Sequence, residues 1–286
     1  MLVMLLKLVA PKYFKILLLG KTGNGKSSVG NRILGKEEFS VACGINSETK
    51  YCCMRYAKRD SNTLIQIVDT PGVSDTHHNH EDILREISKF TATMSPGPDA
   101  ILMVVSGIHR FTEEEYKAYL EAKKLFGEDV ASRTIIVFTG GDELQRKGVR
   151  IEDQIEKGSD NLKQMMKELD NRYIVLNNNA SDEGEKRKQI TELFSSIEGV
   201  RKSVGTQTFN SPMMNDVGKL ADEAAEKVAE DKKLPKADAR RRWNEDVMKV
   251  GTEESAKEPY KFAEVKDKVK HETNKNKVVV KLCVIL

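Results

Sequence analysis

The sequence predicts an α/β fold, with a mostly parallel central sheet covered by helices on both faces and an α-helical extension at the C-terminal end. Short apolar runs rich in β-branched residues alternate with amphipathic helical patterns over roughly the first 200 residues, and only helical patterns follow. Strands that are apolar almost throughout must be buried on both faces. This alternation therefore favours a parallel sheet between two layers of helices.

The expected elements follow one another in a regular order. Strands are expected at 13–20, 64–70, 99–106, 133–140 and 172–178, with a further strand at Cys52 and Cys53. Helices are expected at 26–34, about 80–93, 112–126, 151–169 and 185–198. Sheets of this kind bind ligands at the carboxyl ends of their strands. The polar motifs of the sequence fall at those ends.

Composition limits the classes of function. The 286 residues suffice for one domain of about 180–200 residues and a smaller unit. The 47 basic and 44 acidic residues are mixed along the chain, and a net charge of +3 argues against nucleic-acid binding. The four cysteines show no zinc or disulfide spacing, which favours a reducing, cytoplasmic environment. No apolar run approaches the ~20 residues of a membrane-spanning helix.

The stretch "GKTGNGKS" at 20–27, directly after an apolar strand, fits the G-x-x-x-x-G-K-[ST] pattern of a loop that wraps nucleotide phosphates. Its glycines let successive N–H groups point at phosphate oxygens, and the next helix adds the positive end of its dipole. Lys26 would meet the β- and γ-phosphates, and the Ser27 hydroxyl would bind Mg²⁺. We predict nucleotide contacts from Gly20, Lys21, Thr22, Gly23, Asn24, Gly25, Lys26, Ser27 and Ser28. The fold class is thus that of a P-loop NTPase.

A second motif, "IVDTPG", lies at the end of the next expected strand. The Asp69 carboxylate can hold Mg²⁺, usually through water, and the Gly72 amide can meet the γ-phosphate. The polar loop between the two motifs offers Ser47 and Thr49, and we favour Thr49 as the hydroxyl that completes the Mg²⁺ shell when GTP is bound. The predicted metal ligands are therefore Ser27, Thr49 and Asp69.

Selection of the base is expected from "FTGGDEL". A carboxylate at Asp142, at the end of a strand, could accept both N1–H and N2–H of guanine, whereas adenine lacks this donor pair. The usual N-K-x-D pattern is degraded here to residues 139–142. A later strand ends in three asparagines, Asn177 to Asn179, whose amides could reach the base from the other side. These residues favour guanine over adenine, and an ATP-using P-loop enzyme stays an alternative.

Several blocks together resemble one family: "GKTGNGKSSVGNRILG", "FSVACGINSETKYC", "IVDTPGVSDT", "FTEEEYKAYLEAKKLFGED", "FTGGDEL" and "VLNNNA". They are similar to the GTPases of immunity-associated proteins (GIMAP, also called IAN or AIG-type) over residues 13–200. The resemblance implies a guanine-nucleotide-binding domain with Mg²⁺ and nucleotide-dependent self-association at membranes, with an immune or stress role. It also places the base contact at Asn178, and at Asn177. The family's Arg or His after the Thr of its fourth motif is Gly140 here, which could loosen stacking on the base.

Hydrolysis is expected to be slow. Ras-like enzymes place a water-orienting glutamine where this chain has Val73. The block "GIHRFTEEE" puts Arg110 just before Thr112, which forms a capping box with Glu115. In the family the corresponding arginine is associated with hydrolysis in trans. Our hypothesis is that Arg110 acts so here, the alternative being a surface arginine; the expected catalytic residues are Lys26, Thr49 and Arg110.

The chain divides into an N-terminal arm (1–12), the nucleotide-binding domain (13–205) and a charged helical extension (206–286). The arm "MLVMLLKLVA" lacks a basic start and a cleavage site, which disfavours a signal peptide; an extra strand, a membrane-touching arm or a mispredicted start stay open. In the extension, small apolar residues recur at helical spacing between Val217 and Ala229, suited to docking on the domain or on a partner helix, or marking only a solvated helix.

The last four residues, "CVIL", fit the C-a-a-X pattern, with Leu286 favouring geranylgeranylation of Cys283. Lysines exceed acidic residues over 266–281, and this excess supplies the second signal that one prenyl chain needs at an anionic cytosolic leaflet. An accidental C-terminal cysteine is the alternative.

The expected partners are guanine nucleotide, further copies or paralogues of the chain, and a membrane. The expected function is a slow GTPase stimulated by dimerisation, or else a non-hydrolysing GTP-dependent membrane scaffold.

Overall fold

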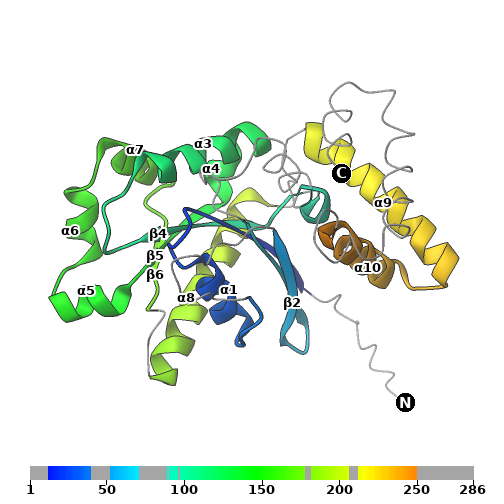
Figure 1. The fold of residues 1–286 in the computed structure, drawn as a ribbon, viewed down its shortest axis with the longest axis horizontal. Coiled ribbons are helices and arrows are strands. Elements are labelled where there is room, and N and C mark those ends of the chain that lie inside the picture. Colours follow the sequence, from blue (N-terminus) through cyan, green and yellow to red (C-terminus); the bar gives the residue numbers. More distant parts are fainter. Residues whose placement is uncertain are drawn as a thin grey trace, which may run out of the picture.

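The computed structural model describes residues 12–39, 52–70, 89, 91–95, 97–177, 182–205 and 212–249. In these residues a six-stranded sheet runs through the middle of the molecule in the order β2-β3-β1-β4-β5-β6 (Figure 1). The strands are β1 (Lys12–Leu19), β2 (Cys53–Asp60), β3 (Thr63–Asp69), β4 (Ala100–Ser106), β5 (Thr134–Thr139) and β6 (Tyr173–Val175). All neighbouring strands are parallel except β2 and β3, which form an antiparallel hairpin. The expected mostly parallel sheet is confirmed.

The helices are α1 (Lys26–Leu34), α3 (Glu113–Phe126), α4 (Val130–Arg133), α5 (Gly141–Lys147), α6 (Ile151–Glu156), α7 (Asp160–Glu168), α8 (Glu183–Val204), α9 (Pro212–Lys232) and α10 (Lys236–Lys249). Figure 1 shows α1 and α8 on one side of the sheet and α3 and α7 on the other. Alternate residues of the central strands enter two separate apolar clusters, so that Leu18 packs on the α1/α8 side and Leu17 on the α3/α7 side. Both faces are therefore covered, as their apolar character requires.

The expected 26–34 helix is confirmed at both ends, but the expected 151–169 helix is wrong as a single element. It is divided into α6 and α7, because Gly158 ends the first helix and the Ser159 side chain accepts a hydrogen bond from the Leu162 amide at 3.4 Å, starting the second. Asp142 was expected at the end of a strand. Instead β5 ends at Thr139, and Asp142 lies in the first turn of α5.

The C-terminal helices α9 and α10 pack on the rest of the described fold. Ala221 and Ala225 of α9 and Trp243 of α10 are buried with Ala92, which belongs to a helical segment of the domain. Asn244 also donates a 3.2 Å hydrogen bond to the Tyr56 hydroxyl of β2. Docking on the domain is thus the alternative that the structure supports for the small apolar stripe, whereas the side chains of 211–217 and 220 lie outside what it describes.

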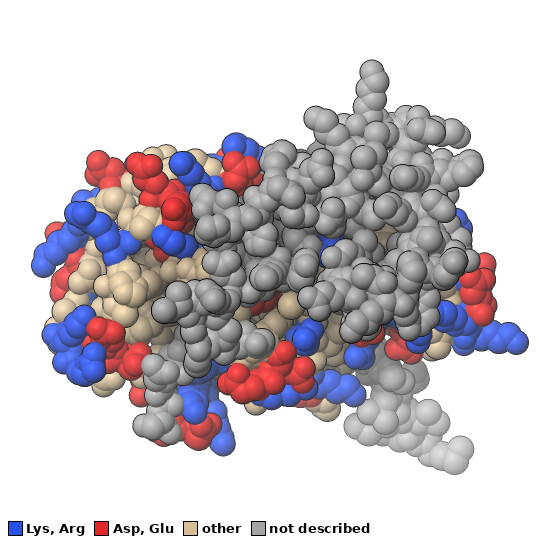
Figure 2. Space-filling model, in the orientation of Figure 1, with Lys and Arg blue, Asp and Glu red and all other residues tan. Residues whose placement is uncertain are grey.

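The described surface is mixed in charge. On the face drawn in Figure 2, basic and acidic side chains alternate over the described part, in keeping with the small net charge of +3. Within the described ranges, none of the helices combines the length and the hydropathy that crossing a bilayer demands.

Candidate nucleotide site at the carboxyl edge of the sheet

The phosphate-loop motif connects the end of β1 to the start of α1, at the carboxyl edge of the sheet. Gly20, Gly23 and Gly25 have φ angles of 141°, 85° and 88°, a region that glycine enters at little cost. At Gly20 a Cβ atom would stand 2.3 Å from the Val104 carbonyl oxygen of β4. Glycine is therefore required where the loop passes its neighbouring strand.

The side chains predicted to hold phosphate and metal lie together. The Ser27 hydroxyl donates to Asp69 Oδ2 at 2.6 Å, joining the first turn of α1 to the end of β3. The Lys26 ammonium is buried and donates across the loop to the Lys21 carbonyl oxygen at 3.1 Å. The strand register places Asp69 beside Leu18, just before the loop begins. Residues 42 positions apart in sequence are thus brought into contact by the parallel pairing of β1 and β3.

The Asp69 carboxyl group suits a hard cation. It is 1% exposed, and its Oδ1 atom has no hydrogen-bond partner in the described part of the protein. Burial raises the pKa of Asp69 above its ordinary value, and the Lys26 ammonium and the Ser27 hydroxyl oppose this rise. An unsatisfied carboxylate oxygen beside a serine hydroxyl is the oxygen donor set that Mg²⁺ prefers. These residues fit a magnesium ion held with a nucleotide.

The Asn24 side chain faces away from the loop's concave side, into the protein. Its Nδ2 donates to the Val104 carbonyl at 3.1 Å and to Glu115 Oε1 at 2.6 Å. The backbone carbonyl of Asn24 accepts a hydrogen bond from the Thr139 hydroxyl at 2.9 Å. Asn24 can therefore meet a phosphate only through its backbone, and its side chain fixes the loop to β4 and α3.

Arg110 lies in the connection between β4 and α3, close in sequence to the capping box. That box is confirmed: Glu115 Oε2 accepts from the Thr112 amide at 2.7 Å and from its hydroxyl at 3.1 Å. The Arg110 side chain is exposed and makes no hydrogen bond or ion pair with the described residues.

The residues expected to read the base lie on two segments that follow neighbouring strands, Asp142 in α5 after β5 and Asn177 after β6. The Gly141 amide donates to the Leu176 carbonyl at 3.1 Å, and the Leu176 amide donates to the Phe138 carbonyl at 2.8 Å. Asp142 and Asn177, each next to one of these residues, therefore lie on adjoining segments. Gly140 has a φ of 80°, so it makes the turn between β5 and α5.

Asn177 is held in place through its backbone by residues that the sequence patterns did not indicate. Arg32 of α1 donates from Nη1 to the Asn177 carbonyl and from Nη2 to Gln189 Oε1 of α8 at 2.9 Å. The same Gln189 oxygen accepts from the Asn177 amide at 3.1 Å. No local signal marks these residues, because the contact joins positions 145 apart in sequence.

Four predicted site residues, Thr49, Gly72, Asn178 and Cys283, lie outside the described residues. Of the others, the structure gathers two groups at the carboxyl edge: the phosphate-loop residues with Asp69, and the pair Asp142 and Asn177. Thr139 joins the two groups through its hydrogen bond to Asn24. Lys21 reaches a third segment, since its ammonium pairs with Glu114 of α3 at 2.6 Å.

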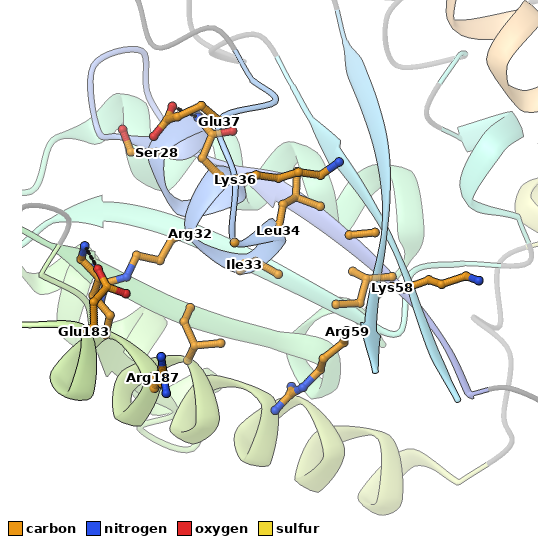
Figure 3. Close-up of a pocket in the computed structure, with 16 residues that line it drawn as sticks. Ser28, Arg32, Ile33, Leu34, Lys36, Glu37, Lys58, Arg59, Glu183 and Arg187 are labelled. Atoms are coloured by element: carbon orange, nitrogen blue, oxygen red, sulfur yellow. Dashed lines mark hydrogen bonds and ion pairs between the residues drawn. The ribbon is translucent and has the colours of Figure 1, made fainter. Parts of the chain in front are cut away.

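A separate groove of about 720 Å³ lies between α1, β2 and α8. In Figure 3, Arg59 extends from β2 toward α8, and Arg32 extends from α1 toward the end of α8 that carries Glu183. Its cations are largely engaged within the protein: Lys36 pairs with Glu38 at 2.6 Å, Lys186 pairs with Glu183 at 2.5 Å, and the Arg59 guanidinium lies 3.5 Å from the centre of a phenylalanine ring. Most cations of this groove, on the α1/α8 side, therefore already contact groups of the protein itself.

Solved structures with this fold include nucleotide complexes. Toc33 from Arabidopsis thaliana with GDP and Mg²⁺ superposes with a TM-score of 0.53 and 21% identity, covering 67% of this chain and 85% of that one. A structure of the chloroplast translocon components atToc33 and psToc159, described with the statement that dimerization is important for their GTPase activity, gives a TM-score of 0.51 and 20% identity over 70% of this chain and 87% of that one. At this level of identity the likeness establishes the fold.

Sequence relatives are more informative about the family. Immune-associated nucleotide-binding protein 4 of Arabidopsis thaliana is 31% identical over 216 residues, which are 75% of this chain and 66% of the relative. Immune-associated nucleotide-binding protein 7 of the same plant is 33% identical over 189 residues, which are 66% and 61% of the two chains. The chain thus spans somewhat less than two thirds of these relatives. The model of the AIG1 family matches residues 14–231, and the chain therefore belongs to the AIG1 family.

Proposed function

We propose that the chain binds GTP with Mg²⁺ and hydrolyses it slowly to GDP and phosphate. The observation that carries the proposal is the hydrogen bond from the half-buried Ser27 hydroxyl to the buried Asp69 carboxylate, whose second oxygen has no hydrogen-bond partner within the described residues, beside the buried Lys26 side chain. Family membership and the GDP–Mg²⁺ complex of the similarly folded Toc33 support it. The nucleotide-binding domain would span 13–205, with 206–286 as its extension.

Each residue has a role in this proposal. Residues 20–28 would surround the phosphates with backbone amides, Lys26 would neutralise charge on the β- and γ-phosphates, and Ser27, Asp69 and Thr49 would hold the magnesium shell. Gly72 would meet the γ-phosphate through its amide. Asp142, with Asn177 and Asn178, would recognise guanine. Magnesium, when bound, supplies positive charge that stabilises the transferring phosphoryl group.

A nucleotide titration of the full chain tests the binding step. Labelled GTP should bind in the presence of Mg²⁺, unlabelled GTP and GDP should displace it, and ATP should not. The physical reason is that the Asp142 carboxylate would be left without a donor opposite adenine. Displacement by ATP as effective as that by GDP would overturn the guanine assignment and favour an ATP-using enzyme.

Stimulation by dimerisation is the second part of the proposal. Arg110 is exposed, lies at the carboxyl edge and makes no hydrogen bond or ion pair with the described residues, so it can reach a nucleotide held by a second copy. A dimerization-deficient arginine variant of Toc33 has been solved with the same fold, at a TM-score of 0.52. We take this as a fold-level analogy only.

Phosphate release over a range of protein concentrations tests this part. Turnover per molecule should rise with concentration for the wild type and stay flat for Arg110→Ala. Arg242→Ala, which removes an exposed arginine on α10 far from the site in sequence, is the matched control and should behave as the wild type. Equal, flat turnover for all three would remove the trans arginine.

A non-hydrolysing GTP-dependent scaffold is the second candidate, because Val73 stands where a water-orienting glutamine is usual. It predicts tight GTP binding without multiple turnover at any protein concentration.

In either case we propose that Cys283 is prenylated and that the basic tail holds the protein at a cytosolic leaflet. Mass spectrometry of the C-terminal peptide from eukaryotic cells checks this; an unmodified Cys283 with Leu286 retained would remove the anchor. The names of the relatives support a role in immunity.

A further inference from the structure

The nucleotide loop and the Arg110 stretch are joined by one buried carboxylate. Glu115 is 3% exposed, whereas Glu113 in the same first turn of α3 is exposed to solvent. Its Oε1 atom accepts from Asn24 of the loop at 2.6 Å, and its Oε2 atom accepts from the amide and hydroxyl of Thr112 at 2.7 and 3.1 Å. Both oxygens of the same side chain are therefore used, one on each segment.

The chemistry of this contact requires a carboxylate. Three donor groups converge on Glu115: the Asn24 side-chain amide, the Thr112 amide and the Thr112 hydroxyl. A glutamine in the same place would offer one acceptor oxygen and would turn an NH₂ group toward one of these donors. A buried donor facing a donor loses its hydrogen bond and its solvation together. Glu115→Gln therefore breaks one half of the contact with almost no change in shape.

The neighbouring residues reinforce the same junction. Lys21 of the loop pairs with Glu114, the residue before Glu115, at 2.6 Å. Asn24 also donates to the Val104 carbonyl of β4, the strand that leads into the Arg110 stretch. The loop is thus held at two of its residues by the strand and the helix that flank Arg110.

We propose that Glu115 is a positioning residue that couples nucleotide binding to the presentation of Arg110. A triphosphate bound by the loop amides would hold Asn24 in this position, and through Glu115 it would hold Thr112, two residues from Arg110. Coupling of this kind is reciprocal. Engagement of Arg110 across a dimer would then tighten GTP binding by the same factor by which GTP favours the dimer. This inference rests on the proposed function, since it needs Arg110 to act in trans.

The test uses the full chain and four variants. Glu115→Gln breaks the contact on the helix side, Asn24→Val breaks it on the loop side, and the double variant completes the cycle. Glu113→Gln removes a charge from the same helical turn at an exposed position and is the matched control. Two quantities are measured: turnover at saturating GTP over a range of protein concentrations, and affinity for a non-hydrolysable GTP analogue in dilute protein.

Glu115→Gln should lower the concentration-stimulated turnover about tenfold, because small misplacements of a catalytic group have effects of this order or larger. The affinity of dilute protein should change less than about threefold, since the phosphate-binding amides and Lys26 remain. Asn24→Val should also lower the concentration-stimulated turnover, and in that quantity the double variant should be no worse than the worse single variant. Glu113→Gln should match the wild type. If Glu115 only stabilised the fold, Glu115→Gln would lower the unfolding temperature and would not reduce turnover more than nucleotide affinity.

The outcomes separate the coupling from the proposed function. If Glu115→Gln and Asn24→Val both keep wild-type stimulation, or if their effects add independently, the coupling is overturned while the dimer-stimulated enzyme stands. If Glu115→Gln unfolds, Asn24→Val decides alone, because it leaves the capping box of α3 intact. Flat turnover in the wild type would remove the proposed trans mechanism, and this coupling with it.

Discussion

The phosphate end and the base end of the site are built in different ways. At the phosphate end one contiguous stretch, 20–28, is completed by a single distant carboxylate, Asp69, through a 2.6 Å contact. At the base end Asp142 lies in the first turn of α5 and Asn177 lies just after β6, and Asn177 is held by side chains of α1 and α8. The residues of the phosphate end are mostly contiguous in sequence, whereas the base end is assembled from separate segments by tertiary packing. Substitutions remote in sequence should therefore disturb base recognition more readily than phosphate binding.

The largest effect is expected at the phosphate end, from Lys26→Ala. Removing the ammonium takes away the one buried side-chain cation within the described part of the loop, and hydrogen bonds to charged groups contribute about 1.5–3 kcal/mol each. Affinity for GTP should fall about 100-fold, with GDP affected less because it lacks the γ-phosphate. Titration with labelled nucleotide measures both. Lys163→Ala, at an exposed position of α7, should bind as the wild type does; unchanged affinity in Lys26→Ala would contradict the entire site.

This comparison also explains how far the sequence could predict the molecule. The 20–27 pattern and the apolar strand before Asp69 are local signals, so the mostly parallel sheet, α1 and the placement of Ser27 and Asp69 at strand ends could be predicted, whereas their direct contact comes from the pairing of β1 and β3. The division of the expected 151–169 helix and the helical position of Asp142 were missed, because apolar periodicity continues across the three-residue break at 157–159. Arg32 and Gln189 carried no signal at all. Their function comes from contacts made only once α1 and α8 pack on the same face.

The second prediction concerns the base end itself. Asp142→Asn replaces an acceptor oxygen by an NH₂ donor, so guanine would meet a donor where its N2–H needs an acceptor. GTP affinity should fall about 30-fold, within the range of a lost hydrogen bond to a charged group. Xanthosine triphosphate, which carries an oxygen at that place, should gain affinity. Competition titrations with both nucleotides measure the exchange.

Glu143→Gln is the control for that substitution. Glu143 is the adjacent acid and pairs with Lys147 at 2.6 Å on the surface of α5. Its removal should leave both affinities unchanged, because exposed pairs contribute little. If Asp142→Asn and Glu143→Gln give the same small change, Asp142 does not read the base.

A smaller effect is expected from Arg32→Met, which tests whether the base end depends on packing. Loss of the guanidinium removes the Arg32 hydrogen bonds to the Asn177 carbonyl and to Gln189, which keeps only its bonds to the Asn177 amide and to Glu185 among those described. GTP should bind about fivefold more weakly, and the ratio of the affinity for GTP to the affinity for inosine triphosphate should be smaller than in the wild type. Arg146→Met, on the exposed face of α5, is the control. An equal loss of affinity for every triphosphate, whatever its base, would instead assign Arg32 to the phosphate end.

The smallest effect concerns stability, and it separates the two ends once more. Asp69 is a buried carboxylate with one oxygen lacking a partner within the described residues, an arrangement that favours the bound metal at the expense of the nucleotide-free fold. Asp69→Asn should therefore raise the free energy of unfolding of the nucleotide-free protein by about 1 kcal/mol, while GTP binding loses its dependence on Mg²⁺. Denaturant unfolding, and titrations with and without a chelator, measure the two quantities. Asp160→Asn, in the exposed first turn of α7, should change neither by more than a small amount. A clear loss of stability in Asp69→Asn would mean that the carboxylate serves the fold, and the trade-off between stability and metal binding would then lie elsewhere in the site.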